Sequence, residues 1–269
     1  MQLNLCLAPT LRGATKEVIK NISISKDIGL QNFLIVPDRF SLQAEKLLFS
    51  QLNITSTFNI EVISISKLAN LVLKLAGQEF NLQNNIEGFL IIYKVLIENQ
   101  NNLESLKNAN ITLEFAKEIF LTISQLKSCE IDYASFAENA KKINSNKFLD
   151  IAEIYGLYAR EIKNKIDATE LLNLFKNEIA NSDLIKKSNF YFAEFDSFTA
   201  QGKSILKLLI QHSNSVTIGI ANSNSKENGY IYEDDVLKKV SDICSELKII
   251  PSINNFNNLN DFQQHIHQN

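Results

Sequence analysis

Hydrophobic positions follow two alternating spacings over roughly the first 80 residues. Short apolar runs predict strands at residues 3–9, 32–37 and 60–64, and the continuous run at 32–37 has the pattern of a buried parallel strand. After each run, at residues 15–25, 41–52 and 66–77, apolar side chains recur three and four positions apart, which is the spacing of one face of an α-helix. Strands and helices that alternate in this order are typical of right-handed crossovers in a parallel sheet.

The middle of the chain has helical spacing only. Five segments from about residue 84 predict helices, at residues 86–100, 111–128, 132–143, 147–165 and 167–180. Strand patterns return at residues 189–196, 215–221 and 248–253, separated by helical patterns at 199–213 and 234–247. We therefore predict an α/β fold in which one parallel sheet is built from both ends of the chain, with an all-helical insertion between them. Ser41, Asp167 and Thr199 are the expected helix caps.

Composition adds few restrictions to this picture. The chain has 269 residues, 45% of them hydrophobic, and a formal net charge of −3. An acidic balance argues against a protein that coats nucleic acid, although it leaves room for a local basic groove. The three cysteines and three histidines show no metal-binding spacing. No apolar run reaches the roughly 20 residues of a membrane span, so we expect a soluble, cytoplasmic protein without a membrane partner.

The first predicted strand and helix are joined in the manner of a phosphate-binding loop. Residues 8–16 read A-P-T-L-R-G-A-T-K. A Walker A loop reads G-x-x-x-x-G-K-[S/T]; its backbone N–H groups hold phosphates and its lysine reaches the β- and γ-phosphates. In this alignment Gly13 and Thr15 match, whereas Ala8 and Ala14 replace the first glycine and the lysine.

The missing lysine is the most serious departure, because its charge neutralises the transferred phosphate. Lys16 follows one position beyond Thr15, and one residue corresponds to about 100° of rotation on a helix, so Lys16 cannot simply replace the lysine. We interpret the stretch as a degenerate phosphate loop that binds ATP and Mg²⁺ weakly or not at all. Its residues are Thr10, Gly13, Ala14, Thr15 and Lys16.

A second acidic signal lies at the end of the strand predicted from residue 189. Glu194 and Asp196 follow the aromatic run and, on an extended strand, would point the same way. In that geometry they could bind a cation beside the phosphate loop. The alternative interpretation is that Asp196 begins a turn and Thr199 caps the next helix.

Four stretches carry more specific patterns. They read V-P-D-R-F-S-L-Q-A-E (36–45), S-I-S-K-L-A (64–69), D-I-A-E-I-Y with D-A-T-E-L-L (150–155 and 167–172), and F-Y-F-A-E-F-D-S-F-T (190–199). In this order they resemble the N-terminal region of the AddB/RexB family over roughly residues 3–221. That family is the B subunit of the bacterial ATP-dependent helicase–nuclease that processes broken DNA ends.

The resemblance implies a RecA-like, superfamily 1 helicase-like domain, which belongs to the P-loop NTPase folds. This domain would comprise residues 1–80 and 186–269, and residues 81–185 would form its helical insertion. The family's second RecA-like domain, its nuclease domain and the cysteines of its iron–sulfur cluster have no counterpart here. We therefore expect an N-terminal fragment without nuclease activity, nuclease metal, iron–sulfur cluster or other cofactor.

The resemblance also implies a role and partners. In the family, an AddA/RexA-type subunit forms a heterodimer with the B subunit and drives translocation. The helicase-like part of the B subunit follows DNA from broken ends and recognises the regulatory Chi sequence. We expect this chain to be a DNA-guiding scaffold rather than a motor.

In helicases the loop after the second strand contacts the single-stranded backbone, and residues 37–43 match it. Arg39 would then pair with a phosphate, Phe40 would stack on a base, and Ser41 would donate a hydrogen bond. The alternative is that Phe40 packs under the helix and Ser41 only caps it. Ser64 and Lys67, after the third strand, are a second candidate DNA contact.

Two other function classes remain open. One is a free-standing P-loop-like NTPase or small-molecule kinase with a helical lid, although its required lysine is missing. The other is a pure protein-interaction module, in which the helical block binds a partner.

Overall fold

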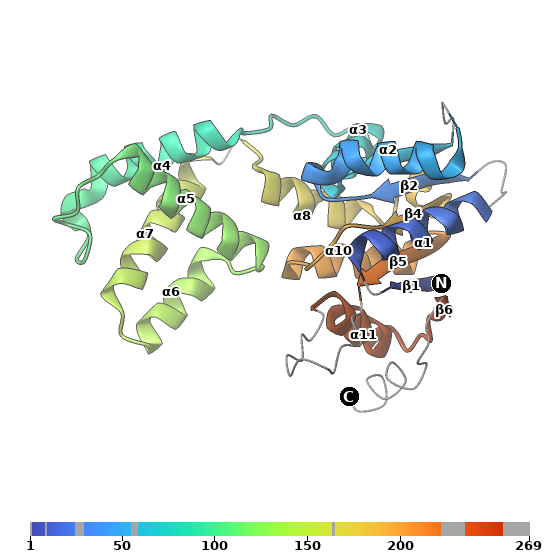
Figure 1. Cartoon of the computed structure of the whole chain (residues 1–269). Coiled ribbons are helices and arrows are strands. Elements are labelled where there is room, and N and C mark those ends of the chain that lie inside the picture. The colour runs from blue at the N-terminus through green and yellow to red at the C-terminus, as the bar shows by residue number, and fades with distance from the viewer. Residues whose placement is uncertain are drawn as a thin grey trace. The chain divides into compact units, whose positions relative to one another are not determined.

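The computed structural model describes residues 2–8, 10–24, 30–54, 59–162, 165–221 and 235–254. The chain divides into two compact units. The sheet unit comprises Met1–Ala76 and Phe175–Asn269, and the helical unit comprises Gly77–Leu174 (Figure 1). None of the described helices combines the length and the apolar character that a membrane span requires.

The sheet unit is built on one six-stranded sheet in the order β3-β2-β4-β5-β1-β6. All of its strand pairs are parallel. The strands are β1 (Leu3–Ala8), β2 (Gln31–Ile35), β3 (Ile60–Ile63), β4 (Ser188–Phe192), β5 (Ser215–Ala221) and β6 (Ser252–Asn254). The α/β fold with a parallel sheet, predicted from the sequence, is confirmed, and it is of the RecA-like kind.

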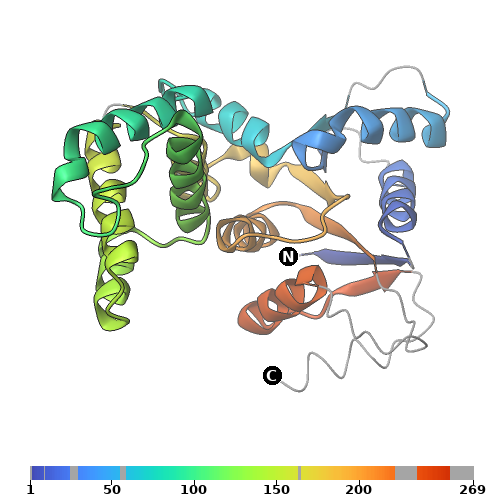
Figure 2. The same ribbon diagram turned by 60° about the vertical axis from the view of Figure 1, so that its left-hand side comes forward.

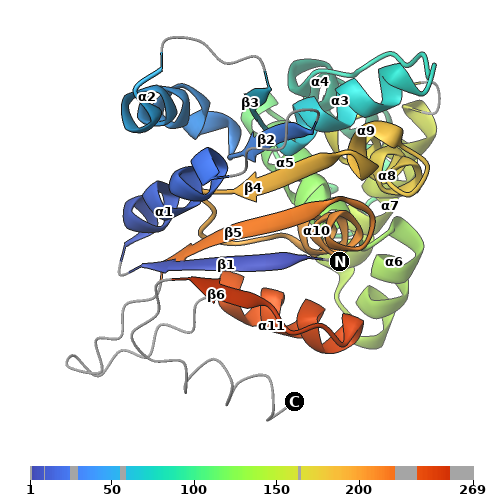
Figure 3. The same ribbon diagram turned by 90° about the vertical axis from the view of Figure 1, so that its right-hand side faces the viewer.

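Helices cover both faces of this sheet, which explains why its central strands are apolar along most of their length. Helices α1 (Leu11–Ile24) and α2 (Ser41–Leu52) lie on one face, and α10 (Ala200–His212) and α11 (Asp235–Leu247) lie on the other (Figure 3). The 3₁₀ turn η1 (Asp38–Phe40) precedes α2, α3 (Ile65–Leu75) follows β3, and α9 (Asp183–Lys186) precedes β4. Every residue of β4 is buried.

The predicted helix caps have different outcomes. Thr199 caps α10, because its side chain accepts a hydrogen bond from Gly202 N, and Asp167 Oδ1 accepts from the N–H groups of Thr169 and Glu170 at the start of α8 (Ala168–Glu178). The prediction for Ser41 was wrong. η1 runs directly into α2, so Phe40 occupies the cap position and Ser41 is already helical.

The helical unit packs its helices around a separate apolar core (Figure 2). Its elements are α4 (Asn85–Asn99), the 3₁₀ turn η2 (Gln100–Asn102), α5 (Leu113–Ser128), α6 (Tyr133–Lys142), α7 (Asn146–Glu161) and the beginning of α8. Asp150 of α7, 4% exposed, fixes the segment after η2, since its carboxylate accepts hydrogen bonds from the N–H groups of Glu104, Ser105 and Leu106.

The chain enters and leaves the helical unit along one short ladder. Leu82 and Ile166 form a parallel bridge, and Gln83 N donates to Ile166 O at 2.8 Å. The resemblance to the AddB/RexB family implied a return to the sheet domain at about residue 186, and the compact sheet unit begins again at Phe175. The reason is that α8 crosses the boundary, and α9 contacts β4 and α10 of the sheet unit.

A row of polar side chains fixes the register of the central strands. Asn32 of β2, Asn189 of β4 and Ser215 of β5 lie opposite one another in the ladder. Asn189 Nδ2 donates to Asn32 Oδ1 at 3.0 Å, and Asn189 Oδ1 accepts from Asn214 Nδ2 and Ser215 Oγ, both at 2.7 Å. A one-residue slip would leave the buried amides of Asn32 and Asn189 without each other, so the row favours a single register.

We expect Asn189→Ala to lower the free energy of unfolding by at least about 2 kcal/mol, because three polar neighbours lose their partner. Asn181→Ala, which truncates an exposed asparagine of the same unit, is the matched control. Urea unfolding followed by circular dichroism measures both. Equal midpoints for the two variants would show that the row contributes nothing to stability.

Candidate functional site

The candidate site lies at the carboxyl edge of the sheet, beyond β1 and β4. The chain leaves β1 through α1 toward β2 on one side, and it leaves β4 through α10 toward β5 on the other. In open parallel sheets, ligands bind at the carboxyl edge where connections diverge in this way. The predicted phosphate loop follows β1, and Glu194 follows β4, so the structure brings both predicted elements to one edge.

Helix α1 begins at Leu11, so most of the predicted phosphate loop is helical. Thr10 caps the helix: its Oγ1 accepts a hydrogen bond from Gly13 N at 3.1 Å, and its carbonyl oxygen accepts from Ala14 N at 2.9 Å. A Cβ on Gly13 would lie 3.1 Å from Thr10 Oγ1 and 3.2 Å from the Ala8 side chain, which explains the glycine. Two N–H groups that a phosphate loop would offer to a ligand are therefore used within the protein.

Ala14 stands where a Walker A loop has its lysine, and it is fully buried. Helix α1 packs closely on β5 here, since a Cβ on Gly219 would lie 3.3 Å from the Ala14 backbone. A lysine at position 14 would direct its ammonium group into this apolar contact, at a large desolvation cost. Lys16 is exposed and lies on a different face of α1.

Thr15 and Glu194 are in direct contact. The Thr15 hydroxyl, buried in α1, donates to Glu194 Oε1 at 2.7 Å and also lies 3.0 Å from the carbonyl oxygen of Leu11. In a working phosphate loop the hydroxyl at this position binds Mg²⁺. In this structure that hydroxyl is instead a hydrogen-bond donor to a carboxylate of the protein.

The sequence-based expectation that Glu194 and Asp196 point the same way was wrong. Strand β4 ends at Phe192, and Glu194 has a left-handed backbone with φ of 62°. Glu194 therefore turns toward Thr15, whereas Asp196 pairs with Arg39 at 3.3 Å on the surface. Among the described residues, no three His, Cys, Asp or Glu side chains gather as metal ligands; His265 and His267 lie outside that part.

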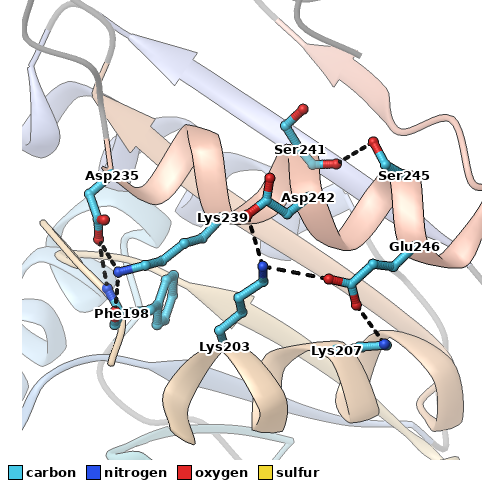
Figure 4. Close-up of polar contacts among 9 residues, drawn as sticks. All are labelled: Phe198, Lys203, Lys207, Asp235, Lys239, Ser241, Asp242, Ser245 and Glu246. Carbon is cyan, nitrogen blue, oxygen red and sulfur yellow. Dashed lines mark hydrogen bonds and ion pairs between the residues drawn. The ribbon is translucent and has the colours of Figure 1, made fainter. Parts of the chain in front are cut away.

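The loop that carries Glu194 is held by aromatic packing and by α11. The rings of Phe195 and Phe198 stack at 4.9 Å, and both contact Phe192. Asp235 Oδ2 accepts from Phe198 N at 3.4 Å, and the Lys239 ammonium group donates to Phe198 O and to Asp235 (Figure 4). Sequence reasoning missed this clamp, because its acceptors and donors include backbone atoms 37 and 41 residues away.

An ion-pair network continues the contact between α10 and α11 (Figure 4). Lys203 pairs with Asp242 at 2.8 Å and with Glu246 at 3.6 Å, and Lys207 pairs with Glu246 at 2.6 Å. The hydrogen bond from Lys207 holds the pKa of Glu246 below its ordinary value. The network supports the helix pair behind the loop.

The predicted DNA-contacting residues lie at the same edge of the sheet. Ile35 and Ile63 are paired, so the segments that begin at Val36 and Ser64 leave neighbouring strand ends. The Arg39 guanidinium lies 4.8 Å from the centroid of the Phe40 ring. The Phe40 ring packs against the core beneath α1 and α2, as the alternative interpretation expected, and Ser41 Oγ is buried without a partner among the described residues.

Ser64 and Lys67 have separate roles in the structure. Ser64 is buried and caps α3, since its side chain accepts from Lys67 N. The Lys67 side chain is exposed. Cys6, in β1, is not a candidate nucleophile, because burial, with a smaller contribution from Glu17, raises the pKa of its thiol to about 12.

Comparison with known proteins finds similarity to one protein family. The family described as "ADDB, N-terminal" matches residues 12–267. The B subunit of the ATP-dependent helicase/deoxyribonuclease of Clostridium botulinum (strain Hall) is 27% identical over 243 residues, which are 88% of this chain and 21% of that protein. The B subunit of the same name from Oceanobacillus iheyensis is 26% identical over 76% of this chain and 19% of that protein. The chain thus spans about a fifth of the length of these curated relatives.

We expect Thr15→Ala to lower the free energy of unfolding by about 1.5–3 kcal/mol, the usual range for a hydrogen bond to a charged group. Thr15→Ser, which keeps the hydroxyl, is the control and should lose less. Urea unfolding of the two variants measures the difference. If both variants unfold at the same midpoint, the contact between Thr15 and Glu194 does not stabilise the site.

Proposed function

The chain belongs to the family described as ADDB, N-terminal, and from this membership we propose that it is the helicase-like N-terminal part of the B subunit of an ATP-dependent DNA helicase/deoxyribonuclease. In this role it acts on DNA ends during recombinational repair of double-strand breaks. Its RecA-like domain is the sheet unit, and the helical unit is an insertion into that domain. The match over residues 12–267 and the parallel sheet formed by both ends of the chain support the proposal.

This domain is a DNA-guiding scaffold that scans for Chi and does not hydrolyse ATP. The observation that carries this conclusion is the 2.7 Å hydrogen bond between Thr15 and Glu194, which engages within the protein the hydroxyl that would bind Mg²⁺ in a working phosphate loop. The Thr10 cap and the buried Ala14 support it, because they remove phosphate donors and the lysine position. Translocation is then the work of an AddA/RexA-type partner in the heterodimer.

Arg39 and Lys67 are the residues of this edge that meet DNA directly. Both side chains are exposed cations beyond neighbouring strand ends, so they can pair with successive phosphates of a single strand. Phe40 offers only part of its ring, which packs against the core. The Ser64 hydroxyl caps α3, whereas the Ser41 hydroxyl is buried without a partner among the described residues.

The helical unit is the surface that meets the partner protein. Of twelve large hydrophobic residues that are exposed in the described part of the chain, nine lie in the helical unit and three (Leu42, Leu75 and Ile250) lie in the sheet unit. Ile86, Leu90 and Ile97 form one stripe along α4, at spacings of four and seven residues. Exposed apolar surface concentrated in this way is typical of a protein–protein interface.

We expect the purified chain to show no saturable binding of a fluorescent ATP analogue with Mg²⁺. Ala14→Lys should fail to restore binding and should destabilise the chain, because position 14 is in the core. Fluorescence titration and urea unfolding measure the two effects. Saturable low-micromolar binding by the wild-type chain would contradict the proposal and favour the alternative, a P-loop-like NTPase or kinase.

The substitutions Ile86→Asp and Ile97→Asp together should reduce co-purification of the AddA/RexA-type partner at least about tenfold, because two charges would be desolvated in the interface. The matched control is Ile250→Asp, which alters a residue 92% exposed in the sheet unit. Co-expression and affinity capture of the tagged chain measure the yield of partner. Undiminished capture by the double variant would place the interface elsewhere.

A further inference from the structure

A cleft of about 370 Å³ opens beside the collapsed phosphate loop, between α1 and α2. Its walls include Arg12 of α1, Gln43, Lys46 and Ser50 of α2, and Glu194 from the loop after β4. The volume is at the lower end of the usual range for ligand sites, roughly 300–1,000 Å³. The cleft is also at the carboxyl edge of the sheet, where α/β folds bind ligands.

The charges of the cleft suggest what it holds. Arg12 and Lys46 are both exposed, and neither forms an ion pair with any residue that the structure describes. Glu194 is the acidic residue of the wall, and its carboxylate already accepts the hydrogen bond from Thr15. The cleft therefore has two positive side chains that form no ion pair with a described residue, and one carboxylate that already accepts a hydrogen bond. This balance of charge favours binding of an anion over binding of a cation.

The neighbouring groups can complete the recognition of an anion. An arginine presents paired N–H donors that match the oxygens of a phosphate, and a lysine adds a point charge. The side-chain amide of Gln43 provides a further donor. The N-terminal end of α1, where Arg12 lies in the first turn, adds a favourable dipole.

We propose that this cleft is a phosphate-ester site, in which Arg12 and Lys46 hold a phosphate of single-stranded DNA. The choice of DNA as the source rests on the proposed function; the phosphate of a free nucleotide has the same chemistry. A phosphate of the DNA backbone would thus bind next to the start of α1, which is where an active helicase motor binds ATP. This site on α1 and α2 would be a third DNA contact, in addition to the proposed contacts of Arg39 and Lys67.

The test uses a fluorescein-labelled oligo(dT) of about 20 nucleotides and fluorescence anisotropy at several salt concentrations. The double variant Arg12→Gln/Lys46→Gln should lose about tenfold in affinity, and its salt slope should fall by about 1.4, which corresponds to two phosphate contacts. The control Lys117→Gln/Lys147→Gln removes two exposed charges from the helical unit and should change neither value appreciably.

The outcomes separate this inference from the proposed function. If the wild-type chain binds DNA and the Arg12/Lys46 variant binds equally well, or the control loses as much, the site is wrong and the proposed function stands. If DNA does not bind but a fluorescent ATP analogue does, and only the Arg12/Lys46 variant loses it, the phosphate-ester site stands and the scaffold role fails. Binding of neither probe overturns both.

Discussion

The hydrogen bond between Thr15 and Glu194 is the constraint on which the functional account depends. It joins the first helix to the loop after β4 at the place where divergent connections leave the sheet. At 2.7 Å the Thr15 hydroxyl donates to a carboxylate of the protein, whereas in a working phosphate loop it would bind Mg²⁺. The other departures agree with it, since Thr10 accepts hydrogen bonds from Gly13 N and Ala14 N, and Ala14 is packed against β5. Together these contacts engage within the protein several groups that a working phosphate loop would offer to a ligand.

The surroundings hold this arrangement in place. The stacked rings of Phe195 and Phe198, the Asp235 and Lys239 clamp on Phe198 and the cap at Thr199 all fix the loop that presents Glu194. In a motor, the corresponding loop must respond to the γ-phosphate. A loop fixed on several sides is better suited to presenting a constant surface, which agrees with the proposed role as a scaffold that guides DNA.

The sequence predicted the larger features well because they depend on periodicity. A continuous apolar run predicted β2 as a buried parallel strand, and an aromatic run predicted β4 as a strand. The change to helical spacing after residue 84 predicted the helical block. The site was harder to predict, because its geometry depends on contacts between distant residues. The left-handed conformation of Glu194 and the helix start at Leu11 determine which groups meet, and neither has a local signature. Ser41 was misassigned for a similar reason, since η1 continues into α2.

A crystal structure determined in the presence of a non-hydrolysable ATP analogue and Mg²⁺ tests the central claim most directly. The account predicts that Thr15 Oγ1 and Glu194 Oε1 remain in hydrogen-bond contact near 2.7 Å, with no nucleotide at the start of α1. A Mg²⁺ ion bound by the Thr15 hydroxyl, with phosphates on the N–H groups at the start of α1, would contradict it.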